Sequence, residues 1–225
     1  MRVVTIPGTQ ERFDLDCPGG AAAWNRALNR RYAMENLRAH GSSVVRAIEA
    51  RRRRAVAALA ARHPFDRALD LGSEDGSLAA AWRRAGRYTL LLDLDPRLLR
   101  AAGERGVTAD AMRLPLADAS FDLVVLSAIL EHLPDPSAAV REAARVLRPG
   151  GRIVAYVPWD KVVVFLKRSA RRLGFGLGAL HDGQAPGHLR DFTRSDLREL
   201  FRPFVRTSRI RLDPLSLGYY VEASV

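Results

Sequence analysis

A short apolar strand that runs into a glycine turn constrains this chain more than any other feature. Residues Ala68–Gly76 read Ala-Leu-Asp-Leu-Gly-Ser-Glu-Asp-Gly, and Asp93 closes a second apolar strand 17 residues after Gly76. In doubly wound α/β sheets a glycine turn lets the backbone approach a cofactor, and a carboxylate about 20 residues further on accepts hydrogen bonds from a ribose. The pattern therefore predicts an α/β sheet that binds an adenosine-containing cofactor.

Strand and helix patterns alternate from Arg67 onward, which is the order that builds a mostly parallel sheet. The apolar runs predict strands at Arg67–Leu71, Tyr88–Asp93, Val107–Asp110, Phe121–Ser127 and Arg152–Val157, and two closing strands at Phe204–Leu212 and Tyr219–Val225. Helices are expected at Ser77–Ala85, Pro96–Gly103 and Ser137–Leu147, the last one stopped by Pro149-Gly150-Gly151. The parallel strands would then bring their carboxyl ends to one edge, where ligands bind.

The residues before this sheet predict a cap, so we divide the chain into a cap at 1–64 and a core at 65–225 within one structural domain. Alternation around Pro7-Gly8 favours a hairpin of Arg2–Ile6 and Arg12–Asp16, and helical patterns follow at Ala21–Ala39 and Ser42–Ala61. Apolar positions of the second helix share a side and leave Arg51–Arg54 toward solvent. Tyr32 and Asn36 share a helix face and would line a lid or simply pack.

Two further segments extend the pattern: Asp110–Ser127, with Leu114-Pro115 and Phe121-Asp122, and Arg145–Val154, with Pro149-Gly150-Gly151. With Asp70–Gly76 and Asp93–Pro96, they stand in the order and spacing of the class I S-adenosylmethionine-dependent methyltransferases. The chain resembles the subgroup that methylates small molecules, quinones and lipids, most closely over Phe65–Val157. This resemblance implies a Rossmann-like, doubly wound seven-stranded sheet and S-adenosylmethionine as cofactor.

The expected cofactor site combines residue chemistry with the resemblance. Gly72 and Gly76 let the backbone pass close to a ligand, and the Asp93 carboxylate can accept two ribose hydroxyls. The resemblance implies that Asp110 contacts the adenine amino group with help from Ala111, and that Ser127 lies beside the methionine moiety. The full expected set is Asp70, Gly72, Ser73, Gly76, Asp93, Leu94, Asp110, Ala111, Met112 and Ser127. One departure is Glu74, where the family usually has glycine.

Residues that follow the fourth strand are candidates for the acceptor side. Leu130-Glu131-His132-Leu133 resembles the ubiquinone-pathway O-methyltransferases, where a Glu-x-x-Glu-His arrangement can hold a divalent metal, but Ala128 replaces the first glutamate here. One carboxylate and one imidazole make a poor site for a hard cation, so we expect no required metal. His132 is a candidate general base, and the alternative is that Glu131 and His132 only orient the loop.

An insert at 159–192 is expected to shape the acceptor pocket. Its first part, Lys161–Arg172, is apolar early and basic late, which suits either a lid over an aromatic metabolite or contact with a membrane and a lipid acceptor. His188 is the second candidate catalytic residue, and the alternative is that it anchors the next helix, which Thr193 or Ser195 would cap.

The charge of +11 is carried almost wholly by arginine, including Arg51–Arg54 and a cluster at Arg168, Arg171 and Arg172, because Lys161 and Lys167 are the only lysines. Such patches can bind nucleic acid or anionic membranes, and they can equally reflect a general preference for arginine. Cys17 is the only cysteine, which excludes an internal disulfide. Without a signal-peptide pattern or a membrane-length apolar run, we expect a cytoplasmic location.

We therefore expect a methyltransferase that acts on a small organic acceptor, most readily at oxygen. The alternatives are an RNA or protein methyltransferase, suggested by the charge, and a non-catalytic binding module that kept the fold, suggested by Glu74 and Ala128. Against nucleic acid, the fourth strand ends in Leu126-Ser127-Ala128 and not in an Asn-Pro-Pro-aromatic box, and no RNA-binding appendage is recognisable.

Overall fold

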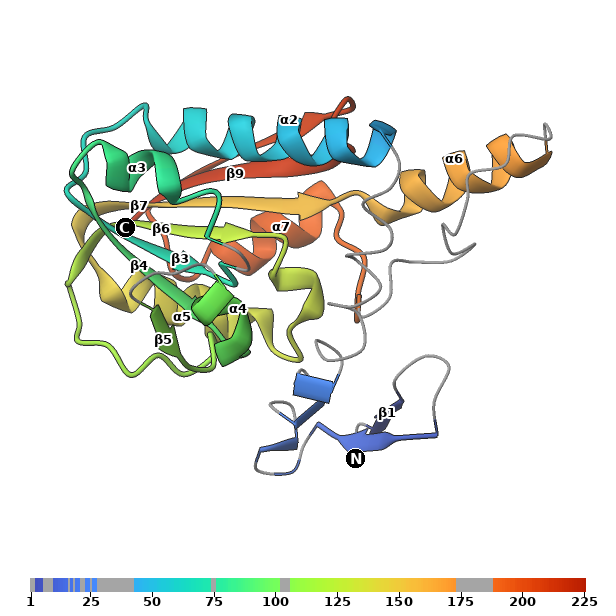
Figure 1. The fold of residues 1–225 in the computed structure, drawn as a ribbon, viewed down its shortest axis with the longest axis horizontal. Helices are drawn as coiled ribbons and strands as arrows, with labels where there is room; N and C mark the ends of the chain where they lie inside the picture. Colours follow the sequence, from blue (N-terminus) through green and yellow to red (C-terminus); the bar gives the residue numbers. More distant parts are fainter. Residues whose placement is uncertain are drawn as a thin grey trace.

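A seven-stranded sheet organises the molecule in the computed structural model (Figure 1), which describes residues 3–5, 10–15, 17, 19–20, 23–24, 26–27, 43–73, 76–101, 106–172 and 188–225. The strand order is β5-β4-β3-β6-β7-β9-β8, and every pair from β5 to β7 is parallel, whereas β9 and β8 are antiparallel. The predicted mostly parallel, doubly wound sheet is confirmed.

Three of the predicted strands have the expected bounds. They are β3 (Arg67–Leu71), β4 (Tyr88–Asp93) and β6 (Phe121–Ser127), and the other strands are β5 (Gly106–Thr108), β7 (Leu147–Pro158), β8 (Thr207–Asp213) and β9 (Gly218–Ser224). The prediction for β5 ran too far, because Arg113 N donates to Asp110 O and turns the chain there. The helix expected to end at Leu147 ends at Val146, because Leu147 pairs with Phe121 in the sheet.

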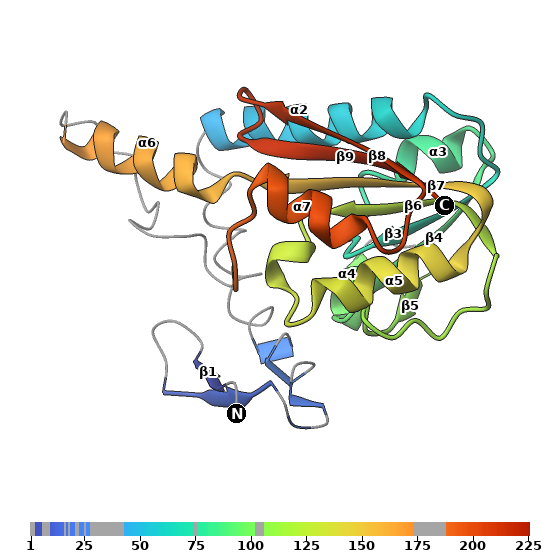
Figure 2. The ribbon, with the colours of Figure 1, turned by 180° about the vertical axis from the view of Figure 1, so that it is seen from behind.

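Helices cover both faces of the sheet (Figure 2). Helices α2 (Ser43–Ala60), α3 (Ala80–Arg84) and α4 (Pro96–Ala101) place Val56, Trp82 and Leu99 in one apolar cluster. Helices α5 (Pro136–Val146) and α7 (Arg194–Phe201) place Val140, Leu197 and Phe201 in the cluster on the other face. Burial of both faces explains why the central strands are almost continuously apolar.

Helix α2 differs from its prediction in one respect. Val56 and Leu59 are buried as expected, but Arg52 is not a solvent-facing side chain. Its guanidinium lies 5.6 Å from the ring centroid of Tyr156 and pairs with Glu49 at 2.5 Å, while Arg51 pairs with Asp213 at 2.9 Å. Part of the arginine run therefore joins α2 to the rest of the molecule.

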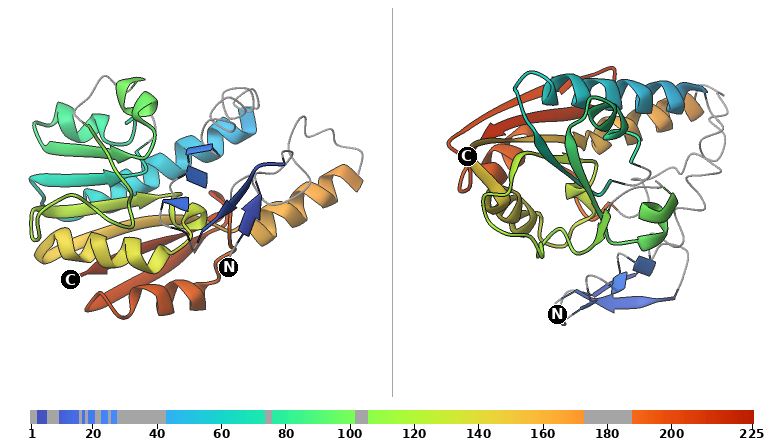
Figure 3. Two further views of the ribbon diagram at one scale, coloured as in Figure 1. Left: turned by 90° about the horizontal axis from the view of Figure 1, so that it is seen from below. Right: turned by 60° about the vertical axis from the view of Figure 1, so that its left-hand side comes forward.

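Two peripheral parts complete the described structure (Figure 3). The predicted hairpin is present as β1 (Val3–Thr5) and β2 (Arg12–Asp14), and Trp24 and Ala27 form a small cluster with Phe13, Leu15 and Leu189. Helix α6 (Asp160–Arg172) leaves the carboxyl end of β7 and extends away from the sheet. None of the described helices combines the length and apolar character needed to cross a membrane.

Candidate functional site

The glycine turn after β3 lies against two neighbouring strands. Gly72 N donates to Leu92 O at 2.8 Å, and Ser73 N donates to the same oxygen at 3.3 Å. Gly72 has φ +69°, and a Cβ atom there would lie 2.9 Å from the Ile129 side chain, which follows β6. Glycine is therefore required for conformation and for space at the point where the strand order reverses between β3 and β6.

Two further turns complete this edge. Asp93, only 6% exposed at the end of β4, accepts a hydrogen bond on Oδ1 from Asp95 N at 2.9 Å. Its own carbonyl accepts from Ala109 N at 3.2 Å, which ties the end of β4 to the segment after β5. There Asp110 Oδ1 accepts from Met112 N at 2.9 Å. The structure thus brings the turns at Gly72, Asp93 and Asp110 together, as predicted.

The remaining predicted cofactor residues lie at or beside these turns. Asp70 is buried in β3, Ser73 and Gly76 are buried in the glycine turn, and Ala111 is buried in the turn after Asp110. Leu94 and Met112 are half-buried, as is Ser127, which ends β6 opposite Tyr156. The helix expected to start at Ser77 starts at Ala80 and has five residues, because Ala79 and Ala80 first turn back onto Gly76 O.

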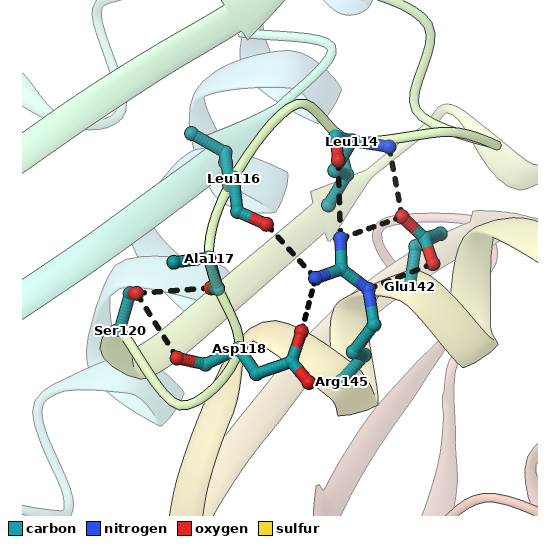
Figure 4. A network of polar contacts seen from close by, with 7 residues as sticks. All are labelled: Leu114, Leu116, Ala117, Asp118, Ser120, Glu142 and Arg145. Carbon is teal, nitrogen blue, oxygen red and sulfur yellow. Dashed lines mark hydrogen bonds and ion pairs between the residues drawn. The ribbon is translucent and has the colours of Figure 1, made fainter.

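A single arginine fixes the segment Leu114–Asp118, which follows Asp110–Met112 in the chain (Figure 4). Arg145, at the end of α5, donates to the carbonyls of Leu114 and Leu116 and to the carboxylates of Asp118 and Glu142. Glu142 in turn accepts from Leu114 N at 2.8 Å. The hydrogen bond from Arg145 lowers the pKa of Glu142, so this carboxylate stays charged at neutral pH. We call Arg145, Glu142 and Asp118 the arginine cluster.

The predicted acceptor-side residues form a second cluster. Ala128, with φ +57°, turns the chain out of β6 into the short 3-10 helix η1 (Leu130–His132). Glu131 is 1% exposed, and the rings of His132 and His188 meet edge to face with centroids 4.7 Å apart. The structure therefore joins the two candidate histidines, although 56 residues separate them in the sequence.

Contacts of His188 and of the two residues that follow it hold the ring in this position. Leu189 N donates to Glu131 O at 2.8 Å, and Arg190 donates to Pro134 O at 2.7 Å. The His188 ring places Nδ1 2.5 Å from Asp160 Oδ2 and Nε2 3.9 Å from Glu131 Oε1. We call Glu131, His132, His188 and Asp160 the histidine cluster.

Burial and charge shift the protonation of this cluster. Burial raises the pKa of Glu131 to about 7, against the opposing effect of His188. Burial would lower the pKa of His188, but the hydrogen bond to Asp160 and the charges of Glu131 and Asp160 outweigh it and raise the pKa. Glu131, His132 and His188 also offer ligand atoms within 4.8 Å of one another, close enough for a metal ion.

Sequence reasoning missed Asp160. The signal available was its place directly after the end of β7, at the edge where ligands bind in such sheets. Thr193, by contrast, caps α7 as expected, through a reciprocal pair of hydrogen bonds with Asp196. The predictions for Tyr32, Asn36 and Glu74 concern positions outside the described residues.

Comparison with known proteins agrees with this geometry. Residues 69–155 match the family model of a methyltransferase domain. The chain is 36% identical over 107 residues to the demethylmenaquinone methyltransferase of Streptomyces griseus, covering 45% of this chain and 46% of that protein. It is 42% identical over 94 residues to the enzyme of the same name from Mycobacterium marinum, covering 40% of this chain and 41% of that one.

The chain thus spans less than half the length of the curated relatives that it matches here. Among solved structures, a SAM-dependent methyltransferase from Thermotoga maritima shares the fold with a TM-score of 0.61 and 18% identity, covering 88% of this chain and 98% of that one. The cofactor of this domain type is S-adenosylmethionine. Residues 69–155 of this chain therefore match a methyltransferase domain, and the chain has the fold of an S-adenosylmethionine-dependent methyltransferase.

Proposed function

We propose that the protein transfers the methyl group of S-adenosylmethionine to a small organic acceptor. The observation that carries this proposal is the convergence of three turns on one sheet edge. Gly72 N and Ser73 N bond to Leu92 O, and Ala109 N bonds to Asp93 O, so backbone hydrogen bonds tie the glycine turn, the Asp93 turn and the Asp110 turn together at one edge. An edge of this kind, with a glycine turn and a carboxylate at the end of the next strand, is where doubly wound sheets bind adenosine-containing ligands.

The residues present fit this cofactor. Gly72 has φ +69° and lies so close to Ile129 that no Cβ atom fits, which gives the close backbone turn that such cofactor sites use. The buried Ser73 Oγ has no hydrogen-bond partner among the described residues, so it is available to a ligand. In the proposed complex, Asp93 and Leu94 hold the ribose, and Asp110, Ala111 and Met112 hold the adenine. Asp70, Gly72, Ser73, Gly76 and Ser127 surround the methionine end.

Methyl transfer makes modest demands on the protein. The bound cofactor supplies an electrophilic methyl group on a sulfonium, so catalysis needs chiefly alignment of the acceptor in a site shielded from water. We assign the acceptor side to His132 and His188. In the simplest form, a neutral imidazole would take the proton of an acceptor hydroxyl as the methyl group leaves the sulfonium sulfur, whose bond to carbon breaks, and joins the acceptor oxygen. Oxygen as the attacked atom is part of this proposal.

Calorimetric titration with S-adenosylhomocysteine tests the cofactor site. Wild-type protein should bind, and Asp93→Ala should abolish the heat of binding because the ribose loses its acceptor. Asp66→Ala serves as the matched control, since Asp66 is an exposed aspartate just before the start of β3, at the opposite end of that strand from Gly72. If the wild type shows no binding, the non-catalytic module becomes the better hypothesis. If Asp93→Ala binds as the wild type does, the assignment of the ribose site is wrong.

The names of the relatives favour a quinone-like acceptor over RNA or protein. Two exposed apolar side chains favour a lipid-soluble acceptor, because they could contact a membrane that holds it. Phe165 in helix α6 and Leu215 in the β8–β9 turn are each 66% exposed. Sedimentation with anionic phospholipid vesicles tests such peripheral contact, and Phe165→Ser should reduce the bound fraction. No change would remove the membrane part of the proposal. The cytoplasmic location stays a prediction.

A further inference from the structure

Glu131 is an unusual buried carboxylate. It is 1% exposed, and neither of its oxygens accepts a hydrogen bond from another residue that the structure describes. A buried carboxylate without such partners is costly, and proteins normally compensate it with a cation or several donors. The nearest cationic candidate is His188, whose Nε2 lies 3.9 Å from Glu131 Oε1.

That separation is too long for a hydrogen bond. It does suit two atoms that share a metal ion, because imidazole nitrogens and carboxylate oxygens each lie about 2.0–2.2 Å from a bound transition metal. His132 offers a third atom, and all three ligand atoms lie within 4.8 Å of one another. Two atoms at about 2.0–2.2 Å from one ion are at most about 4.4 Å apart, so rotations of these side chains would bring the three atoms to bonding distance from a common centre.

Asp160 supplies the support that metal-binding histidines usually have. Its Oδ2 lies 2.5 Å from His188 Nδ1, so the ring can donate its Nδ1 proton there and keep the Nε2 lone pair directed toward Glu131. A carboxylate behind a ligating histidine fixes the tautomer and the orientation of the ring. The bonds of Leu189 N to Glu131 O and of Arg190 to Pro134 O hold the two segments together independently of any ion.

We infer that Glu131, His132 and His188 form a binding site for a divalent transition metal, with Asp160 holding His188 in place. Two imidazoles and one carboxylate favour manganese, iron, cobalt or zinc over magnesium, which prefers oxygen ligands alone. Three protein ligands leave coordination positions for an acceptor oxygen, whose proton loss the ion would assist. With the ion bound, this assistance would replace the imidazole base proposed above, because a ligating nitrogen has no lone pair left to take a proton. That catalytic role rests on the proposed function, whereas ion binding itself does not.

From the sequence we expected no required metal, because only Glu131 and His132 were considered as ligands. Ala128 removes the first glutamate of the resembled arrangement, and the third donor comes instead from His188, on a segment that follows α6 in the chain. The donor set therefore differs from that arrangement in composition and in the element that provides it.

Calorimetry on chelator-treated protein, titrated separately with MnCl₂, ZnCl₂ and MgCl₂, tests the inference. We expect Mn²⁺ and Zn²⁺ to bind with a stoichiometry near one, and Mg²⁺ to bind more weakly. His188→Ala and Glu131→Gln should abolish this binding, and Asp160→Asn should weaken it on the order of 10–100-fold. His63→Ala is the matched control, because His63 lies before the start of β3, away from this cluster.

Two outcomes would overturn the inference: a wild-type protein that binds neither Mn²⁺ nor Zn²⁺, or a His188→Ala variant that binds them as the wild type does. In the first case, a protonated His188 paired with both carboxylates would account for the cluster. Tighter binding of Mg²⁺ would overturn the assigned class of metal. Circular dichroism checks that each variant folds. S-adenosylhomocysteine binding, measured on the same samples, separates a failed metal site from a failed cofactor site.

Discussion

The arginine cluster and the histidine cluster are both built from charged side chains of separate segments, but they differ in how well those charges are satisfied. Arg145 donates five hydrogen bonds to two carbonyls and two carboxylates. Glu131 accepts none from another described residue and faces two imidazoles. A fully satisfied network stabilises one arrangement of the chain, whereas an incompletely satisfied one marks a place where a ligand or proton completes the set.

This difference distinguishes the cluster that supports the scaffold from the cluster that we propose binds a ligand. The arginine cluster holds the segment that follows Asp110–Met112, so its contribution to the cofactor site is indirect. The histidine cluster lies where β6 and β7 end and where the chain returns after α6. Mutations in the arginine cluster should therefore reduce chiefly the stability of the fold, and mutations in the histidine cluster should reduce chiefly ligand binding.

The largest expected effect on stability comes from Arg145→Met. The variant removes the arginine donor from Glu142, Asp118 and two loop carbonyls, and we expect the free energy of unfolding to fall by about 2–3 kcal/mol. Urea denaturation measures this, with Arg141→Met, an exposed arginine on the same helix, as the control. S-adenosylhomocysteine should also bind more weakly because the Asp110 turn loosens. A loss no larger than that of Arg141→Met would mean that the network is not structural.

The same variant predicts a change in acid stability. The folded pKa of Glu142 lies below its ordinary value of 4.5, so its stabilising effect is present above that pH and is lost as pH falls through the folded pKa. The stability gap between wild type and Arg145→Met should therefore narrow as pH drops below about 4.5. A gap of constant size down to pH 3 would contradict this assignment.

The next largest effect concerns the histidine cluster. If it binds a metal, MnCl₂ at about 100 times its dissociation constant should stabilise chelator-treated wild-type protein by about 2.7 kcal/mol, because the ion binds the folded state alone. Urea denaturation with and without the salt measures the increment, and His188→Ala should show none of it. An equal increment in that variant would place the ion elsewhere.

A smaller effect tests the contact between the glycine turn after β3 and Ile129, which precedes η1. Gly72→Ala puts a side chain at φ +69° and 2.9 Å from Ile129, and we expect a loss of about 1–2 kcal/mol from the strained backbone. The free energy of S-adenosylhomocysteine binding should fall by more than the free energy of unfolding, because the turn must move from its place beside Leu92. Gly86→Ala, also at positive φ but with open space around it, controls for the backbone term.

The smallest effect concerns Ala128, which adopts φ +57° between β6 and η1. Ala128→Gly relieves the strain but makes the unfolded chain more flexible, so we expect a net change of about 0.5 kcal/mol or less in stability. Thermal unfolding checks the stability, and metal titration should remain close to that of the wild type. A marked loss of metal affinity would show that the strained turn itself positions Glu131 and His132.

The sequence by itself determined the sheet and the elements of the cofactor edge. Strands β3, β4 and β6 have their predicted bounds because a buried parallel strand is a short apolar run that ends at a turn, which is local information. Asp93 and Asp110 were identifiable for the same reason, since each follows directly on an apolar run. The error at α5 arose because pairing of Leu147 with Phe121 of another strand decided the end of the helix, and the error at β5 arose because a turn at Asp110–Arg113 follows the strand.

Only the tertiary structure decided the acceptor side. His188 meets Glu131 because Leu189, Arg190 and Asp160 each bond across long sequence separations, and no local pattern encodes such partners. Arg52 turned toward Tyr156 for a similar reason, since its helix had to pack on β7. Local patterns specify elements, whereas the chemistry of this second site depends on which side chains the packed elements bring within a few ångströms of each other.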